Sequence, residues 1–212
     1  ALGFMSLAIN QPLHLSDQEI DAEQFKSAFD DTLGTQRVFF YDHWGSLDGD
    51  NLINKIRYMA RGCGCNYVVL DHISIVVSGM EGGDERRMID NTMTKLRALA
   101  EEVNVGILMV SHLKRPQGNR GHEDGAKTSM AQLRGSAGIG QLSDIVIGCE
   151  RDQQSENPNT TTVRVLKNRW TGETGIACYL EYNKDTGRMT ETEQPQEINF
   201  DDDKDESKIE DF

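Results

Sequence analysis

The sequence predicts an α/β fold in which a mostly parallel sheet is flanked by helices and is followed by an antiparallel hairpin and an acidic tail. Three apolar runs of strand length, 67–71, 105–110 and 145–149, alternate with segments whose apolar residues recur at helical spacing. Apolar strands that alternate with helices are typical of a parallel sheet covered on both faces. The acidic end, residues 191–212, is nearly free of apolar side chains and departs from this pattern.

The N-terminal third is expected to contain two helices. The first covers 16–33, with Ser16 as its N-cap and Glu19 as the capping-box partner. A short β-rich run, 37–42, separates it from a second helix over 48–61, which has apolar side chains on one face. This second helix leads into the first buried strand.

The later elements continue the alternation and then change to a hairpin. Asp84 can cap a helix over 84–103 between the first two buried strands, and a short helix over 129–142 precedes the third. The alternating runs 161–169 and 175–182 are joined by a short turn. This arrangement predicts an antiparallel hairpin added to the sheet.

The net charge of −13 at pH 7 is concentrated at one end of the chain. Residues 191–212 contain ten acidic and two basic side chains and so carry −8 of it. We therefore divide the chain into a domain over 1–190 and a tail over 191–212, which we expect to be disordered because it buries too little apolar surface to offset chain entropy. No apolar run approaches the roughly 20 residues that span a bilayer, which argues against a membrane role. Four cysteines without paired spacing indicate the reduced thiols of a cytosolic protein.

Polar residues follow two of the buried strands, at the carboxyl ends where ligands bind in open α/β sheets. Asp71 is the leading candidate for a Walker B carboxylate that organises Mg²⁺ through a bound water beside two phosphates. The alternative is that Asp71 only caps a turn. His112 would emerge at the same edge if the two strands are neighbours, and could donate to a phosphate. A lone histidine in that position is more often an ordinary loop residue.

Cationic side chains gather in one loop and in the hairpin. The Gly-containing loop 114–127 suits the backbone phosphates of nucleic acid, although a solvated surface loop explains it about as well; its candidate DNA-binding residues are Lys114, Arg115, Arg120 and Lys127. Lys167 and Arg169 are two positions apart and so share one face of a strand. An arginine held by a strand can reach a neighbouring subunit's nucleotide, but ordinary strand surfaces often carry such pairs.

The phosphate-binding motif G-x-x-x-x-G-K-[S/T] does not occur in the sequence. We therefore expect that the chain alone does not hydrolyse ATP. The apolar stretch 1–5 has neither the basic segment nor the cleavage site of a secretory signal, and we interpret it as mid-chain sequence. Together these observations predict that the chain begins within a longer protein.

Eight stretches stand in unbroken order between about residues 36 and 190: Leu70–Val77, Asp84–Asn91, Ser111–Lys114, Leu133–Ser136, Gln141–Asp144, Glu150–Arg151, Lys167–Gly172 and Glu181–Lys184. In this order they closely resemble the primase-helicases of small T-seven-type phages, which are ring helicases of the DnaB and RecA-like superfamily. The resemblance implies a RecA-like helicase domain that forms a hexamer and moves 5′ to 3′ on single-stranded DNA. It also implies Mg²⁺ and a nucleoside triphosphate, ATP or dTTP, bound between subunits.

The resemblance implies catalytic roles for four residues. Asp71 corresponds to the Walker B aspartate and His112 to the sensor of the γ-phosphate. Arg169 corresponds to the arginine finger that acts on the neighbouring subunit, with Lys167 beside it. The family's catalytic glutamate would lie upstream of Ala1.

Further roles follow from the same resemblance. Arg151 and Tyr182 correspond to the pair that sandwiches the nucleotide base, and Gln141 to a glutamine that links the nucleotide site to the DNA loop. The loop 114–127 corresponds to that DNA loop, although its cations are arranged differently from the family's. The acidic tail ending in Phe212 is similar to a tail that binds the replicative DNA polymerase and competes with the single-strand binding protein. The implied location is the cytoplasm of a phage-infected bacterium.

Two other functions stay open on the residues alone. A RecA-type recombinase or a clock ATPase would share the sheet and the Walker B strand, but would need a different DNA-loop sequence and would not predict the acidic tail. A non-catalytic interaction module would use the sheet as a scaffold and the tail to recruit partners.

Overall fold

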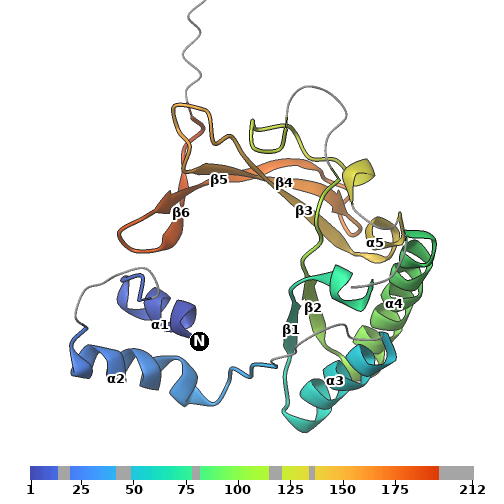
Figure 1. The fold of residues 1–212 in the computed structure, drawn as a ribbon, viewed down its shortest axis with the longest axis horizontal. Helices are drawn as coiled ribbons and strands as arrows, with labels where there is room; N and C mark the ends of the chain where they lie inside the picture. The colour runs from blue at the N-terminus through green and yellow to red at the C-terminus, as the bar shows by residue number, and fades with distance from the viewer. Residues whose placement is uncertain (14–19, 42–48, 78–81, 115–120, 134–136, 196–212) are drawn as a thin grey trace, which may run out of the picture.

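The structure is a computed structural model, and the residues that it describes are 1–13, 20–41, 49–77, 82–114, 121–133 and 137–195 (Figure 1). Several predictions concern residues outside these ranges, namely the helix cap formed by Ser16 and Glu19, the loop cations Arg115 and Arg120, and the tail beyond residue 195.

The predicted parallel pairing is confirmed for the first two buried strands. Strand β1 (Tyr67–Leu70) pairs in parallel with β2 (Gly106–Met109), and each residue of one faces a residue of the other without a bulge. The crossover between them is α4 (Gly82–Val103), which matches the helix expected over 84–103. Helix α3 (Gly49–Gly62) precedes β1 and matches the helix expected over 48–61.

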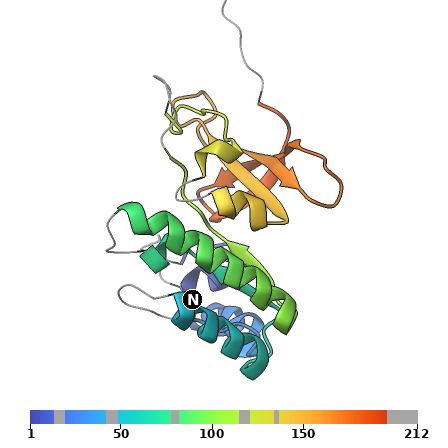
Figure 2. The same ribbon diagram turned by 90° about the vertical axis from the view of Figure 1, so that its right-hand side faces the viewer.

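Helices cover one face of this two-stranded sheet in the described residues, and not both faces as the apolar runs predicted. Helices α3 and α4 lie side by side along the same face, in front of the strands in Figure 2. Because side chains alternate along a strand, Val68 and Leu70 are buried under the helices. Tyr67 and Val69 point the other way and are 73% and 70% exposed.

The main core fills the space between the helices and the strands. Ile56 from α3, and Ile89 and Leu99 from α4, are almost fully buried in it. The same cluster continues through Ile139 and Val146 towards the second sheet. Such continuous burial supplies most of the folding free energy of a domain and here joins the two sheets into one packed unit.

The C-terminal half forms a four-stranded antiparallel sheet with its strands in chain order. The strands are β3 (Ile145–Arg151), β4 (Thr160–Asn168), β5 (Gly175–Asn183) and β6 (Arg188–Thr192). The predicted hairpin is confirmed as β4 and β5, but it joins β3 and not the parallel pair. Assigning 145–149 to the parallel sheet was therefore wrong, because an apolar run gives a strand's burial and not its direction of pairing.

Two further differences concern short elements near the second sheet. The helix expected over 129–142 is a 3₁₀ turn, η3 (Met130–Gln132), and a separate helix, α5 (Ala137–Leu142). Strand β6 was not predicted, and it extends to Thr192, so the first residues of the segment assigned to the tail are strand.

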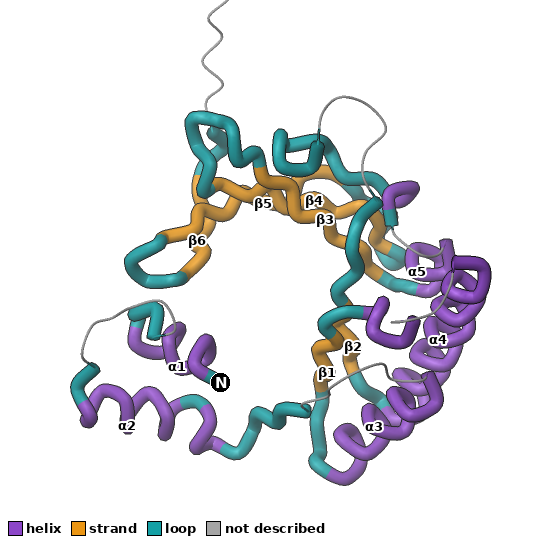
Figure 3. The backbone as a smooth tube through the Cα atoms, in the orientation of Figure 1, coloured by secondary structure: helices purple, strands orange, loops and turns teal. Residues whose placement is uncertain are grey.

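The N-terminal helices lie on the side of the β1–β2 sheet away from α3 and α4 (Figure 3). Helix α1 (Leu2–Ile9) was not predicted, whereas α2 (Ala22–Asp31) lies within the expected helix over 16–33. The run 37–41 is not a strand, because a β-rich segment forms one only where a partner completes its ladder. The Arg188 guanidinium donates a hydrogen bond to the carbonyl of Leu7, which links α1 to the start of β6. None of the helices among the described residues is long and apolar enough to cross a membrane.

Candidate functional site

The carboxyl ends of β1 and β2 place two of the predicted site residues at one edge. The amide of Val110 donates to the Leu70 carbonyl at 2.9 Å, and the amide of Ile73 donates to the Val110 carbonyl at 3.0 Å. These bonds continue the parallel register beyond the strands, so Asp71 and His112 leave the sheet together. Both side chains are exposed there, and the prediction that they share an edge is confirmed.

A second histidine, which the sequence reasoning did not single out, completes this edge. The rings of His72 and His112 meet edge to face, with their centroids 4.3 Å apart. Nδ1 of His72 is buried and has no hydrogen-bond partner among the described residues. The ring of His72 therefore packs against the ring of His112, while the exposed carboxylate of Asp71 remains accessible to a ligand.

The same edge fits Mg²⁺ bound mainly by a substrate. Within the described ranges, no group of three histidine, cysteine or acidic side chains could hold a metal ion by itself. Mg²⁺ usually keeps several waters and is bound by one or two carboxylates together with substrate phosphates. Asp71 supplies one exposed carboxylate at this edge, and a site in which substrate phosphates and water provide the other ligands needs no more from the protein.

The ends of the basic loop 114–127 are attached to neighbouring segments. At its start, the Lys114 amide donates to the Gln132 carbonyl at 2.7 Å, and the His122 ring contacts the Lys114 carbonyl at 2.9 Å. Lys114 and Lys127 are exposed, as a phosphate contact would need. The start of the loop at Lys114 is therefore held by a hydrogen bond to Gln132, outside the loop.

A buried carboxylate holds the other end of the loop. Glu150 of β3, whose side chain is only 7% exposed, accepts hydrogen bonds from the amide and the hydroxyl of Thr128 at 2.7 and 2.8 Å. Arg164 of β4 donates to both carboxylate oxygens at 2.7 and 2.9 Å. Burial by itself would raise the pKa of Glu150, but the Arg164 and Thr128 donors outweigh it and lower that pKa.

The end of β4 is hydrogen-bonded to the turn that follows α5. The ammonium of Lys167 donates to three backbone carbonyls, those of Gly140, Gln141 and Ser143, at 2.7, 3.0 and 2.8 Å. The last carbonyls of a helix lack partners within the helix and carry its negative dipole end, so a cation there is stabilising. Lys167 therefore fixes the backbone that carries Gln141, whose own side chain is exposed.

Arg169 lies just past β4 and is bound to the same turn. Its Nη2 donates to the Gln141 carbonyl at 3.1 Å, and its Nη1 lies 3.1 Å from Oδ1 of Asp144. The other carboxylate oxygen of Asp144 pairs with Arg97 of α4 at 2.5 Å. This hydrogen bond is the main cause of the raised pKa of Arg97. The structure thus brings Lys167, Arg169 and Gln141 together at one turn, with Asp144 and Arg97 beside them.

Arg151 and Tyr182 are placed at the opposite end of the antiparallel sheet. Arg151 is paired with Thr161 at the end of β3, and the Tyr182 amide donates to the Asn159 carbonyl just before β4. Arg169 follows the other end of β4. Because a strand rises about 3.3 Å per residue, the two ends of β4 are separated by roughly 25 Å. Arg151 and Arg169 therefore cannot serve one and the same phosphate.

Over residues 8–191 the sequence matches the family of DnaB-like helicase C-terminal domains. The chain belongs to this family. It is 46% identical over 164 residues to the DNA helicase/primase of Enterobacteria phage T3, a match that covers 77% of the chain and 29% of that protein. It is 27% identical over 152 residues to the replicative DNA helicase DnaB of Geobacillus stearothermophilus, covering 68% and 33%. This DnaB-like domain thus spans about a third of the length of these two relatives.

Solved structures share the fold of this DnaB-like domain. A DnaB-like replicative helicase, solved to describe its interactions with primase, superposes with a TM-score of 0.67 at 21% identity over 91% of the chain and 46% of its own. A second solved structure, an ATPase domain, gives 0.68 at 20% identity, over 91% and 69%. A KaiC-like protein of Pyrococcus horikoshii gives 0.54 at 15% identity, over 82% and 72%. At these identities the likeness concerns the fold alone, and it confirms the predicted RecA-like architecture.

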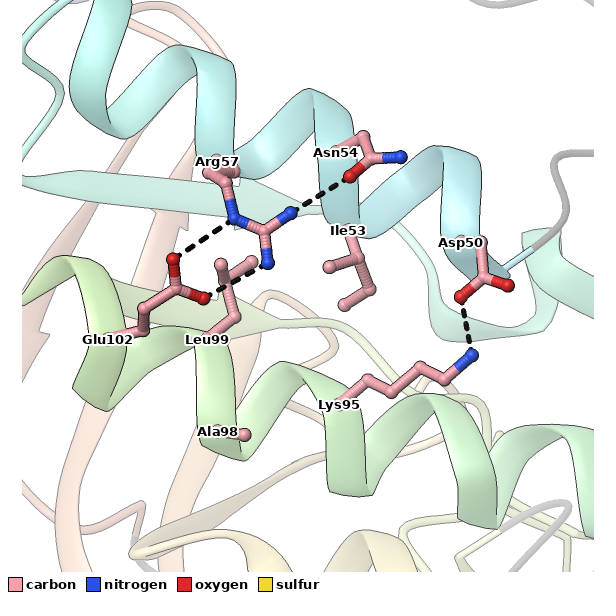
Figure 4. Close-up of a pocket in the computed structure, with 8 residues that line it drawn as sticks. All are labelled: Asp50, Ile53, Asn54, Arg57, Lys95, Ala98, Leu99 and Glu102. Atoms are coloured by element: carbon pink, nitrogen blue, oxygen red, sulfur yellow. Dashed lines mark hydrogen bonds and ion pairs between the residues drawn. The ribbon is translucent and has the colours of Figure 1, made fainter.

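The groove between α3 and α4 is separate from all these residues (Figure 4). Two exposed ion pairs span it, Arg57 with Glu102 at 3.0 Å and Lys95 with Asp50 at 2.5 Å. None of the site residues that we predicted lines it. Exposed pairs of this kind contribute at most about 1 kcal/mol each, so the groove is the solvated seam between two packed helices.

Five residues of this DnaB-like domain contact the predicted site without having been predicted: His72, Arg97, Thr128, Asp144 and Glu150. Asp144 and Glu150 lie within stretches that carry the family resemblance, and this could have marked them as candidate site residues. Arg97 had none, because it is one of several cations on a long amphipathic helix.

We predict that Glu150→Gln lowers the free energy of unfolding of the chain by about 2 kcal/mol at pH 7, since it removes a charged acceptor of four hydrogen bonds. The lowered pKa of Glu150 means that its contribution is complete above the ordinary glutamate pKa near 4.3 and is lost as the pH falls through the folded-state value. The difference between the two proteins in urea unfolding should therefore shrink below about pH 4.

The matched control is Asp30→Asn, which breaks an exposed pair with Lys26 on α2 and should cost less than about 0.5 kcal/mol at either pH. A loss at Glu150 that does not change with pH, or no loss, would show that the ionised carboxylate does not stabilise the base of the loop.

Proposed function

We propose that this chain is the C-terminal part of the motor of a replicative DNA helicase, which moves 5′ to 3′ on single-stranded DNA as a hexameric ring driven by nucleoside triphosphate. The observation that carries the proposal is the shared edge at which Asp71 and His112 leave two parallel strands, in a chain of the DnaB-like family. Ligands of open α/β sheets bind at this edge. The chain alone, without a phosphate-binding motif, is not expected to hydrolyse nucleotide.

At this edge Asp71 would organise Mg²⁺ through a water, and His112 would donate to the γ-phosphate of ATP or dTTP. The metal would neutralise charge that develops on the phosphates. His72 would keep the His112 ring at the mouth of the sheet, because the two rings are in contact. Loss of the γ-phosphate would then change the contacts of a residue that lies only two positions before the basic loop.

Arg169 lies at one end of the antiparallel sheet, and Arg151 and Tyr182 lie at the other. This separation supports a proposal in which the two ends contact different parts of the bound nucleotides. In a ring, Arg169 with Lys167 would approach the nucleotide of the neighbouring subunit, and Arg151 with Tyr182 would hold a base. Gln141, on the turn that Lys167 and Arg169 bind, would connect the nucleotide to the DNA loop. The loop cations would contact the phosphates of single-stranded DNA, namely Lys114 and Lys127 together with Arg115 and Arg120 of the same loop. Such phosphate contacts are electrostatic and do not depend on the base sequence.

The partners of the full-length protein are proposed from its acidic tail. An acidic segment can compete with nucleic acid for a basic surface, and Phe212 offers one apolar anchor for a pocket. We propose the replicative DNA polymerase and the single-strand binding protein as the proteins that meet at this tail, in the cytoplasm of an infected bacterium. Six tails on one ring would raise the effective concentration of the contact.

We predict that Asp71→Asn in the full-length protein lowers DNA-stimulated NTP hydrolysis by about 100-fold or more, because the carboxylate that would hold the metal-bound water loses its charge. Ring assembly, measured by sedimentation, should be unchanged, since Asp71 is exposed and outside the core. Asp185→Asn, an exposed carboxylate on the turn between β5 and β6, is the matched control and should hydrolyse normally. Near-normal turnover by Asp71→Asn would refute the proposed metal role.

We predict that Arg169 acts across a subunit boundary, so that rings mixed from Arg169→Ala and Asp71→Asn subunits recover hydrolysis that neither parent ring has. In a mixed ring, some boundaries bring an intact Asp71 to an intact Arg169. A control mixture of Arg169→Ala with the double variant contains no such boundary and should stay inactive. If assembled mixed rings gained no activity at any ratio, the action of Arg169 in trans would be excluded.

We predict that deleting residues 201–212 weakens polymerase binding by the full-length ring, more at low salt, where exposed charges are least screened. Hydrolysis and unwinding of a bare fork should change little. Phe212→Ala should cause part of the loss, because it removes the apolar anchor and keeps the charge. Equal polymerase binding by the intact, deleted and substituted rings would leave the tail with a role in solvation only.

A further inference from the structure

The carboxylate of Asp144 is shared by two arginines from different elements. Oδ1 is 3.1 Å from Nη1 of Arg169, and Oδ2 is 2.5 Å from Nη1 of Arg97. Each arginine thus pairs with a different oxygen of the carboxylate. The backbone fixes this arrangement as well, because the Arg169 amide donates to the Asp144 carbonyl at 2.9 Å. Asp144 and Arg169 therefore stay opposite each other even when their side chains separate.

The two arginines differ in their exposure and in their distance from the Asp144 carboxylate. Arg169 is 42% exposed just past the end of a strand, and among the described residues its side chain also donates a hydrogen bond to the Gln141 carbonyl. Arg97 lies on α4 and is also paired with Glu101 at 3.1 Å, one turn further along the same helix. Arg97, at 2.5 Å and 34% exposed, is thus the closer and less exposed partner of Asp144, whereas Arg169, at 3.1 Å, is the more weakly held of the two.

Release of Arg169 would be costly if Asp144 had no other cation. Asp144 is only 28% exposed, and a partly buried carboxylate that loses its partner is destabilised. With Arg97 in place, the carboxylate stays paired while Arg169 turns towards another anion. Sharing also weakens the hold on Arg169, because each cation reduces the negative field that the other one meets.

We propose that Asp144 is a positioning residue for Arg169: it presents the guanidinium at the end of β4, and Arg97 keeps the carboxylate paired so that Arg169 can move to a phosphate group. This inference rests on the proposed function, in which Arg169 contacts the phosphates of a neighbouring subunit's nucleotide. Asp144 itself touches no substrate in this arrangement. Its effect on turnover must therefore pass entirely through Arg169.

The test measures DNA-stimulated hydrolysis of NTP by full-length rings with Asp144→Asn, with Arg169→Ala, and with both substitutions. Asp144→Asn should lower kcat about tenfold and leave KM within about twofold, because a misoriented side chain loses transition-state contacts more than substrate binding. In the Arg169→Ala background, the same substitution should have no further effect on kcat. Arg97→Gln should also lower kcat, because Asp144 would then hold Arg169 alone.

Two controls separate orientation from folding. Glu101→Gln breaks the other ion pair of Arg97 and should leave kcat unchanged. Asp144→Glu keeps the charge and should recover most of the lost turnover, whereas a packing defect would persist. If Asp144→Asn lowers kcat equally with and without Arg169, the positioning role is overturned while the function of Arg169 stands. If Arg169→Ala rings turn over normally, the proposed finger itself is wrong.

Discussion

The placement of the predicted catalytic cations depends on the interaction between Lys167 and the carbonyl groups at the end of α5. Helix α5 packs against α4 and so belongs to the core around the parallel strands, whereas Lys167 belongs to the antiparallel sheet. Three hydrogen bonds from one ammonium therefore tie the two sheets together at a single turn. The unpaired carbonyls and the negative end of the helix dipole make that turn a favourable place for cations.

This attachment explains why the predicted catalytic cations occupy structural positions. Lys167 lies near the end of β4 and Arg169 just past it, and the turn that both bind is followed directly by β3. Because β3 pairs with β4 from Ile145 opposite Asn168 onwards, the turn cannot move without changing the start of that ladder. A cation that reaches another subunit from this place is thus supported by a rigid strand on one side and a fixed helix on the other.

The sequence predicted the elements with strong periodicity and the residues at strand ends. Parallel strands meet at one edge, so Asp71 and His112 could be placed together from two apolar runs alone. The sequence could not predict that β3 turns away from the parallel pair, because its apolar residues would suit either sheet. Nor could it predict partners brought together by tertiary packing. Arg97 and Asp144 are 47 residues apart, and only the contact between α4 and α5 brings them into reach.

Glu150, which binds the base of the basic loop, and Arg151, a predicted nucleotide contact, are consecutive residues. Glu150 and Arg151 are consecutive in β3, so their side chains point to opposite faces of the sheet. Glu150 points inward and binds Thr128, the residue next to Lys127 of the loop, while Arg151 points outward. Thr128, the buried carboxylate and the strand that carries Arg151 are therefore linked by consecutive contacts. Because the pair of Glu150 with Arg164 is bidentate and largely buried, this strand position resists local rearrangement, and it keeps Thr128 in place relative to the strand that carries Arg151.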